Sequence, residues 1–395
     1  MTLIKSISGI RGIVDNGFDE HTLIEFATAF SNIQDCGPIL IAIDGRTHGK
    51  QFSKILSKFL ISKGRDVIDC GIVPTPTAQY IISKNKYAGG IIITASHNPS
   101  EWNGMKFIDN DGCFISPDKN KMLLNPMSSN NIQDELKTYD NNNQPIDYHK
   151  KSIEKHLNNV INLSVINKSR IQNKQYKIVV DAINSSTSKI LPLLLEEFSC
   201  EVIPINCNGD GNFSRGAEPL PNNLLETSKA VIDNQADFGI ATDPDGDRLA
   251  IIDERGMPIG EESTLVICCD SLLIDRKIKT PIVVNLSTSM AINKLANNHN
   301  IEVIRTKVGE INVVNKMKQI NAVIGGEGNG GVILPESHYG RDSLVATALL
   351  LNRLSMENIT ISELYSKIPH YQIIKDFIST NKILDADFMY NIKEK

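Results

Sequence analysis

The chain has 395 residues, of which 41% are hydrophobic, and it carries a formal net charge of −5 with a pI of about 5.9. Such a length is enough for several domains of roughly 100–200 residues each. The acidic balance argues against a general nucleic-acid binder, which usually shows a basic patch or a high pI. No apolar stretch approaches the roughly 20 residues of a membrane span, so we expect no membrane partner.

The seven cysteines are scattered and form no C-x-x-C pair, although Cys268 and Cys269 are adjacent within an apolar run. An odd number of cysteines without metal-ligand spacing favours a reducing compartment. The segment from Met1 to Val14 has no apolar core of signal-peptide length. We therefore expect a cytoplasmic protein.

Short apolar runs alternate with amphipathic segments along the chain, which predicts an α/β fold with largely parallel sheets. The predicted strands are 39–43, 67–70, 91–94, 176–181, 200–205, 236–241, 281–285, 302–305 and 322–324. The predicted helices are 52–60, one that opens at Pro74, then 148–160, 185–198, 288–298, 312–318 and 343–354. Polar segments at 128–143, 162–175 and 206–223 are predicted loops, and the last is long enough to favour a functional role. The layout indicates three diverged copies of one α/β unit.

The segment Thr94–Pro99, T-A-S-H-N-P, follows a buried apolar run. Ligands of open α/β sheets lie beyond the carboxyl ends of the strands, so Ser96 is a candidate reactive hydroxyl. The stretch after it returns Lys106 towards the same edge. A hydroxyl beside a cation suits phosphoryl transfer, because the transferred group carries negative charge. The alternative is an ordinary turn, since Asn-Pro favours turns and serine caps helices.

Asp243, Asp245 and Asp247 alternate along a predicted turn between two apolar runs. Three carboxylates this close repel one another unless a hard cation holds them, and oxygen ligands select Mg²⁺, Mn²⁺ or Ca²⁺. A calcium loop of the EF-hand type needs glycine at its sixth position, which here is Arg248. Beside a phosphoryl group, Mg²⁺ is the better choice. The alternative is an Asp-rich surface turn.

Three further segments carry groups suited to phosphate or sugar. Arg11 stands in a glycine-flanked segment, and arginine suits bidentate phosphate contacts. Residues 305–310 place a cation, a hydroxyl and a glycine before a predicted helix, which is a plausible anion contact. Residues 325–331 are too glycine-rich for a regular element, and their Glu327 and Asn329 are the residue types that hold sugar hydroxyls. Taken alone, an arginine between glycines is more often simply solvated. Residues 305–310 are equally compatible with an ordinary strand-to-helix loop, and residues 325–331 with a hairpin turn.

Taken together and in order, T-A-S-H-N-P, D-P-D-G-D-R and G-E-G-N-G-G resemble the motifs of the α-D-phosphohexomutases, over nearly the whole chain. These enzymes interconvert hexose 6-phosphates and 1-phosphates, and the form of the glycine-rich loop resembles that of the phosphoglucosamine mutases among them. The resemblance implies an isomerase with three successive mixed α/β domains around a central cleft. Its partner is a phosphosugar, and the chain is a monomer or a homodimer.

By this resemblance, Ser96 is a phosphoserine whose phosphate binds one Mg²⁺ together with Asp243, Asp245 and Asp247. The phosphoryl group passes to the sugar phosphate, giving a bisphosphate that turns over and returns its other phosphate to the serine. Hexose bisphosphate is therefore an expected activator. The catalytic residues implied beside Ser96 are Lys106, with an acid–base role, Arg11, Arg248 and His97. The implied substrate-binding residues are Glu327, Asn329, Thr306, Gly309 and Arg341.

The sequence departs from the family pattern in two places. Gly331 stands where many members have histidine, so any proton-transfer role of that histidine is absent or filled elsewhere. The family's fourth domain has a phosphate-gripping loop, R-x-S-G-T-E-P, to which nothing here corresponds, and residues 371–395 resemble only the start of that domain. The expected domains are 1–145 with the phosphoserine loop, 146–255 with the metal loop, 256–368 with the sugar loop, and 369–395 as an incomplete fourth.

Three other functions remain open on the sequence. A phosphomannomutase or phosphoglucomutase is the nearest alternative, because the sugar loop does not decide the substrate. A hydrolase with Asp243 as nucleophile is another, since Asp-x-Asp after a strand also occurs in aspartyl-phosphate enzymes. A truncated, inactive or weakly active protein that binds sugar phosphates is the third.

Overall fold

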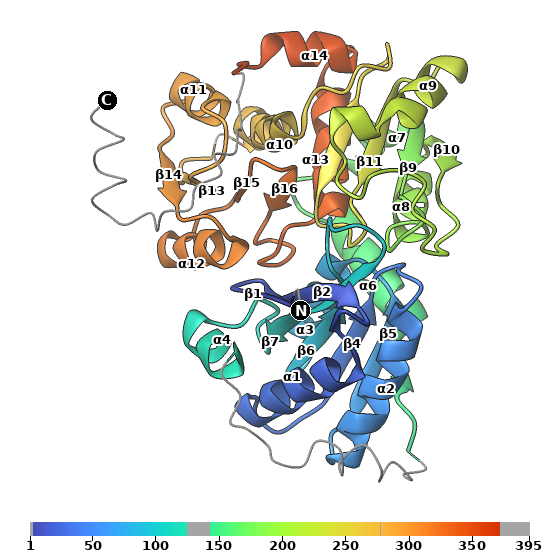
Figure 1. Cartoon of the computed structure of the whole chain (residues 1–395). Helices are drawn as coiled ribbons and strands as arrows, with labels where there is room; N and C mark the ends of the chain where they lie inside the picture. The colour runs from blue at the N-terminus through green and yellow to red at the C-terminus, as the bar shows by residue number, and fades with distance from the viewer. Residues whose placement is uncertain (1–2, 125–142, 277, 372–395) are drawn as a thin grey trace, which may run out of the picture.

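The computed structural model describes residues 3–124, 143–276 and 278–371. Three mixed β-sheets follow one another along the chain, each with helices packed against it. In Figure 1 the first sheet, blue to teal, fills the lower half, and the second (green to yellow) and third (orange) lie side by side above it. Among the described residues, no helix is long and apolar enough to cross a membrane.

The strands fall into three sheets. The first contains β1 (Ile4–Ser6), β2 (Gly9–Val14), β3 (Gly17–Phe18), β4 (Ile39–Ile43), β5 (Val67–Ile72), β6 (Gly89–Ile93), β7 (Trp102–Asp109) and β8 (Ile146–Asp147). The second contains β9 (Lys177–Asp181), β10 (Glu201–Ile205), β11 (Phe238–Thr242) and β12 (Leu249–Ile252). The third contains β13 (Ile282–Asn285), β14 (Val303–Thr306), β15 (Gly325–Glu327) and β16 (Gly331–Ile333).

The helices connect and cover these sheets. Those before β9 are α1 (Glu20–Ile33), α2 (Gly49–Ser62), α3 (Thr75–Lys84), α4 (Pro117–Leu124), α6 (His149–Ile161) and α7 (Lys168–Gln172). The second sheet carries α8 (Ile190–Glu197), the 3-10 turn η1 (Pro221–Asn223) and α9 (Leu225–Asp233). The remainder are α10 (Glu261–Arg276), α11 (Ala291–Asn298), α12 (Glu310–Ile320), α13 (Ser343–Met356) and α14 (Ile361–Lys367).

One strand order occurs in all three sheets. It is β5-β4-β6-β7 in the first, β10-β9-β11-β12 in the second and β14-β13-β15-β16 in the third. In each case the first three strands are parallel and the fourth is antiparallel. The first sheet is extended beyond this unit by β2, β1 and β3 next to β7, and by β8 next to β5. The expected repetition of one α/β unit is thus present in the topology.

The repeated order places three of the predicted functional loops at equivalent positions. Each loop connects the third strand of its unit to the fourth: residues 94–101 join β6 to β7, residues 243–248 join β11 to β12, and residues 328–330 join β15 to β16. The third strands are central and fully buried, so each loop starts from a rigid position. Rigid strands that end in irregular loops are a common basis for binding sites.

Helix α13 is buried along almost its whole length. It packs against α10 and against β12 and β16, so it lies between the second and third sheets (Figure 1). Its sequence is apolar on nearly every side, as expected for a helix with no solvent face. Each of its polar side chains has at least one partner, for example Arg353 with Asp270 at 2.6 Å. This buried helix makes the second and third units one packed body.

Several expectations need correction. The first three strands of each unit are parallel, as expected, but each unit ends in an antiparallel strand that the sequence did not indicate. The strand predicted at 322–324 is wrong: the strand is β15, so the glycine-rich stretch forms a β-hairpin. The helix predicted at 185–198 starts only at Ile190, because Ile183 and Asn184 are left-handed and Ser185 bonds elsewhere. Most of 128–143, and 372–395 with the expected fourth domain, lie outside the described residues.

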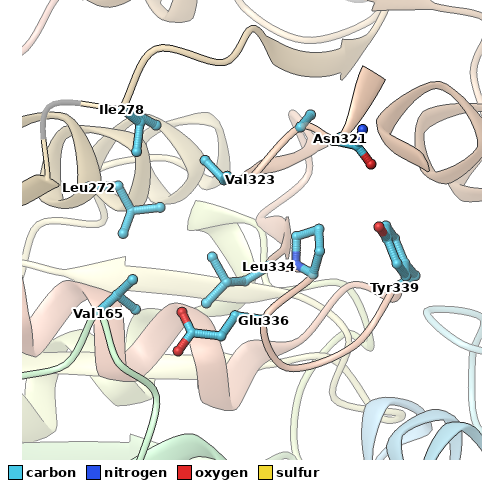
Figure 2. A pocket seen from close by; sticks show the side chains of 10 residues that line it. Val165, Leu272, Ile278, Asn321, Val323, Leu334, Glu336 and Tyr339 are labelled. Atoms are coloured by element: carbon cyan, nitrogen blue, oxygen red, sulfur yellow. The ribbon is translucent and has the colours of Figure 1, made fainter. Parts of the chain in front are cut away.

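A mainly apolar pocket of about 250 Å³ lies beside the end of α10. In Figure 2 the aliphatic side chains of Val165, Leu272 and Leu334 face one another around this space. Asn321, Glu336 and Tyr339 supply polar atoms. None of the lining residues belongs to the predicted active site, so the pocket is a separate feature.

Candidate active site

The loop 243–248 brings three carboxylates together. Asp243, Asp245 and Asp247 are buried, and each offers a carboxylate oxygen that lies within 4.8 Å of those of the other two. Each also leaves one carboxylate oxygen, Oδ2 of Asp243 and Oδ1 of the other two, without a hydrogen-bond partner. Unpaired buried carboxylate oxygens are costly unless a cation binds them. The donor set therefore fits a hard divalent cation, as predicted.

The backbone of this metal loop (residues 243–248) is held from three directions. The carbonyl of Pro244 accepts hydrogen bonds from the hydroxyls of Ser185 and Ser186 at 2.6 and 2.7 Å. The next carbonyl, that of Asp245, accepts one from the backbone N–H of Thr75 at 2.8 Å. The carbonyl of Gly246 accepts one from the Ser343 hydroxyl at 2.7 Å. Consecutive carbonyls are thus held by the second, first and third units.

Lys106 lies next to this loop. It is on β7 opposite Ile92, and its Nζ donates to Oδ2 of Asp245 and, at 3.1 Å, to Oδ2 of Asp247. Burial disfavours the ammonium form, but the two aspartates outweigh this effect and raise the pKa of Lys106 above its ordinary value. The predicted convergence of Lys106 and the acidic loop is present, and the lysine carries a proton there.

Ser96 has a strained backbone. It is buried, and its φ of 51° lies in the left-handed region, which costs a residue other than glycine about 1–3 kcal/mol. Such strain is typical of residues that the fold holds for a function. The Ser96 hydroxyl lies 3.4 Å from Nδ1 of His97, so the two predicted residues are adjacent in space as well as in sequence.

Arg248 links the serine loop to the metal loop. Its Nη2 donates to Nδ1 of His97 at 2.9 Å, and its Nη1 donates to Glu218 at 2.6 Å. Burial and the charge of Arg248 lower the pKa of His97 to about 4. Since a guanidinium only donates, Nδ1 accepts, and the neutral ring carries its proton on Nε2. Arg11 reaches the same loop and donates to Oδ1 of Asn98 at 2.9 Å.

Arg341 joins the metal loop to the glycine-rich hairpin. It donates to Asp247 at 2.6 Å, to Glu327 at 2.6 Å and to Glu310 at 3.0 Å. Glu327 also accepts from the backbone N–H of Gly309 at 3.2 Å. The predicted residues Arg341, Glu327 and Gly309 are therefore in one network, and this network touches the metal loop.

Two predicted sugar-binding residues differ in their placement. The side-chain oxygen of Asn329 is buried without a hydrogen-bond partner, which leaves an acceptor available on the hairpin. The hydroxyl of Thr306 instead donates to the carbonyl of Lys307 at 3.1 Å, with the carbonyl of Val284 as a more distant acceptor at 3.5 Å. Among the hydrogen bonds of the described residues, it makes none to another predicted site residue.

Some site residues were not singled out from the sequence. Glu218 anchors Arg248, Glu310 anchors Arg341, and Thr75 donates to Oδ2 of Asp245 at 2.8 Å. Glu218 belongs to the long loop 206–223, whose length was the one available signal. Glu310 directly follows Gly309, the glycine of the predicted anion-binding segment 305–310. Nothing local to Thr75 indicates its role.

Comparison with known proteins matches this arrangement. The models of phosphoglucomutase/phosphomannomutase α/β/α domains I, II and III match residues 3–134, 154–256 and 261–371. A phosphoglucosamine/phosphogalactosamine mutase of Sulfurisphaera tokodaii is 31% identical over 97% of this chain and 84% of its own length. A phosphoglucomutase/phosphomannomutase of Thermococcus kodakarensis is 32% identical over 93% of this chain and 80% of its own length.

The fold comparison agrees. The crystal structure of a phosphoglucomutase/phosphomannomutase family protein from Burkholderia thailandensis has a TM-score of 0.77 at 24% identity, and covers 93% of this chain and 81% of that one. The chain thus contains three α/β domains of the phosphohexomutase class of enzymes. It belongs to the phosphoglucomutase/phosphomannomutase family. Below, domains I, II and III denote the residues that these three family models match.

Proposed function

We propose that the chain is a phosphoglucosamine mutase that interconverts glucosamine 6-phosphate and glucosamine 1-phosphate through a phosphoserine at Ser96. The observation that carries the proposal is the convergence of the strained Ser96 loop and the acidic metal loop, bridged by Arg248 and His97. The Sulfurisphaera relative is named for amino-sugar phosphates. The hairpin with Glu327 and Asn329 is rich in acceptors, which suits the hydroxyls and the ammonium group of an amino sugar.

The residues have distinct roles in this reaction. The O–P bond at Oγ of phospho-Ser96 breaks as a sugar hydroxyl attacks phosphorus. Lys106, which holds a proton on Nζ, gives it to Oγ and regains one from the attacking hydroxyl. Arg11, Arg248 and the Nε2–H of His97 face the charge of the transferred group. The resulting bisphosphate reorients, and its other phosphoryl group returns to Ser96.

The metal loop would hold one Mg²⁺ through Asp243, Asp245 and Asp247, with the Ser96 phosphate as a further ligand. A divalent cation there neutralises charge on the transferred phosphoryl group. A hexose bisphosphate would act as activator, because it phosphorylates Ser96 when the serine is unmodified. Buried thiols such as Cys268, with a pKa raised by burial, and the absence of any disulfide among the seven cysteines fit a cytoplasmic setting.

The test is turnover of glucosamine 6-phosphate by the purified chain with Mg²⁺ and a trace of hexose bisphosphate, followed as formation of the 1-phosphate. We expect activity in the wild type and none in Ser96→Ala. Release of inorganic phosphate, measured in the same samples, tests the hydrolase alternative. A hydrolase with Asp243 as nucleophile would still release phosphate in Ser96→Ala and would release none in Asp243→Asn. A folded wild type that takes up phosphate on Ser96 yet does not turn over would instead support a sugar-phosphate-binding protein.

A phosphoglucomutase or phosphomannomutase is the second candidate, favoured by the name of the Thermococcus relative. The ratios of kcat/KM for glucosamine, glucose and mannose 6-phosphates separate the two. Preference for glucosamine 6-phosphate supports the proposal, and preference for either neutral sugar overturns the substrate assignment while leaving the mutase chemistry intact.

A further inference from the structure

Arg46 grips the loop that carries Ser96. The residue is almost fully buried, at 2% exposure. Its Nη2 donates to the carbonyls of Ser96 and Asn98 at 2.7 and 2.8 Å, and its Nη1 donates to the carbonyl of Pro99 at 2.6 Å. A planar guanidinium with several fixed donors is suited to holding several carbonyls at once. The carbonyls of residues 96, 98 and 99 are thereby fixed by one side chain.

The amide side of Ser96 is held by the same group of residues. Asp44 accepts from Nε of Arg46 at 3.0 Å and from the hydroxyl of Thr94 at 2.6 Å. The Thr94 hydroxyl in turn accepts from the backbone N–H of Ser96 at 2.9 Å. Asp44, Arg46 and Thr94, here called the cradle, therefore hold both the N–H and the C=O of the serine. This double hold explains how a left-handed φ persists at a residue with a side chain.

The cradle is also joined to the metal loop. The backbone N–H of Gly45 donates to the hydroxyl of Ser185 at 2.9 Å, and that hydroxyl donates to the carbonyl of Pro244 at 2.6 Å. The guanidinium of Arg46 is covered by the ring of Phe213, with 5.0 Å between its central carbon and the ring centroid. A cradle in domain I is thus fixed directly to domain II. The serine loop and the metal loop share one set of supports.

We propose that Arg46 is a positioning residue for phosphoryl transfer, holding Oγ of Ser96 in register with the acidic loop. The inference rests on the proposed mutase function, whose nucleophile it orients. All three nitrogens of the buried Arg46 guanidinium are engaged, Nε with Asp44 and both terminal nitrogens with carbonyls of the serine loop, so it acts through Ser96 rather than on the substrate. Transfer between a serine and a sugar depends steeply on this register, because misplacement by about 1 Å can cost about 100-fold in rate.

The test compares Arg46→Lys with Arg65→Lys. Lysine keeps the charge but has a single nitrogen and cannot reproduce the fork. Arg65 is a matched control in domain I: it donates to the carbonyls of Ser31, Gln34, Asp35 and Gly37 at the end of α1, with no contact to the serine loop. We expect kcat to fall about 100-fold in Arg46→Lys with KM changed less than about threefold, and neither to change in Arg65→Lys.

A second readout does not depend on activity. Amide hydrogen exchange of the segment 94–101 should quicken in Arg46→Lys and stay at the wild-type rate in Arg65→Lys. If Arg46→Lys does not fold, Thr94→Val removes the hydroxyl that holds the Ser96 amide and is expected to show the same two effects. A folded Arg46→Lys or Thr94→Val with wild-type kcat and unchanged exchange overturns the proposal. If the wild type is inactive but amide exchange of residues 94–101 is still faster in the variants, the mutase function is contradicted while the positioning of Ser96 by Arg46 stands.

Discussion

Position 331 has no room for a side chain, because the side chain of Arg341 packs against it. A Cβ built at position 331 would lie 2.3 Å from Cδ of Arg341, well inside van der Waals contact. The arginine has no easy alternative place, since Asp247, Glu310 and Glu327 each bind a different nitrogen of its guanidinium. The space that a side chain at position 331 would fill is thus occupied by an arginine from another segment of the chain.

Gly331→Ala should therefore weaken substrate binding as well as stability. Overpacking of a rigid site costs about 1–3 kcal/mol, which urea unfolding measures. Because Arg341 leaves Glu327, we expect kcat/KM to fall about 10-fold or more.

Gly49→Ala serves as the control for this change. Its new Cβ would lie 3.4 Å from the nearest atom, at an ordinary distance, at the start of α2. We expect no loss of stability and wild-type kcat/KM there, because alanine fits and reduces the conformational freedom of the unfolded chain. Wild-type kcat/KM in Gly331→Ala would show that Arg341 does not set the sugar site.

At the scale of elements, the N-terminus of α13 is a junction. Asp342 caps the helix, accepting from the backbone N–H groups of Leu344 and Val345 at 2.8 and 3.3 Å. Its second oxygen accepts from Nε2 of His156 at 3.0 Å and of His338 at 3.2 Å. The neighbouring Ser343 holds the metal loop. The cap therefore ties helix α6 to a residue that fixes the active site.

Acid should loosen this junction. Burial, with His156 and Lys84 nearby, lowers the pKa of His338 although Asp342 opposes the shift. An unfolded histidine titrates near about 6.5, so below that pH the unfolded chain binds more protons and stability falls as pH falls. Tyr80 packs against the ring of His338, and the hydroxyl of Thr77 is hydrogen-bonded to His156. We expect a lower urea midpoint at pH about 5.5 than at about 7.5.

His338→Asn should lose less stability between these two pH values, because asparagine does not titrate. His299→Asn, at an exposed position, is the control and should follow the wild type. An equal loss in His338→Asn and in the wild type would place the acid sensitivity outside the junction.

At the scale of the whole molecule, the three buried carboxylates of the metal loop repel one another and make stability depend on pH. Burial, then the charges of Asp247 and Asp245, raise the pKa of Asp243 well above its ordinary value. Without a cation, the folded chain therefore keeps a proton that the unfolded chain releases above about pH 4, and its stability falls as pH rises. A bound cation replaces this proton.

Mg²⁺ should consequently raise the Tm more at pH 8 than at pH 6, since it competes with the proton less at higher pH. At 100 times its Kd, a ligand of the native state adds about 2.7 kcal/mol to stability. Thermal unfolding with and without MgCl₂ at both pH values measures the effect. Asp243→Asn should abolish its pH dependence, and an equal Tm rise at both pH values in the wild type would contradict the account.

The sequence predicted the parts of this molecule whose signals are local. Apolar runs predicted the three parallel strands of each unit to within two residues, apart from β15, but not the antiparallel fourth strands or the strands that extend the first sheet. Ser96, Lys106, Arg248 and the three aspartates converge as expected. A hairpin turn at 325–331 was one of the open alternatives, but strands β15 and β16 themselves were not predicted, because glycines suggest a loop, whereas here they allow close strand pairing. Arg46, Glu218 and Glu310 were missed because their roles depend on partners 30 or more residues away.

The equivalence of the three loops has an evolutionary consequence. If one ancestral unit was duplicated, its single loop position has been specialised three times: for the proposed nucleophile Ser96, for the acidic cluster that begins at Asp243, and for the acceptor-rich hairpin that follows Glu327. Division of labour was then possible without altering the frame that presents each loop. A change of substrate would then need substitutions in only one of the three loops, while the other two retain the chemistry.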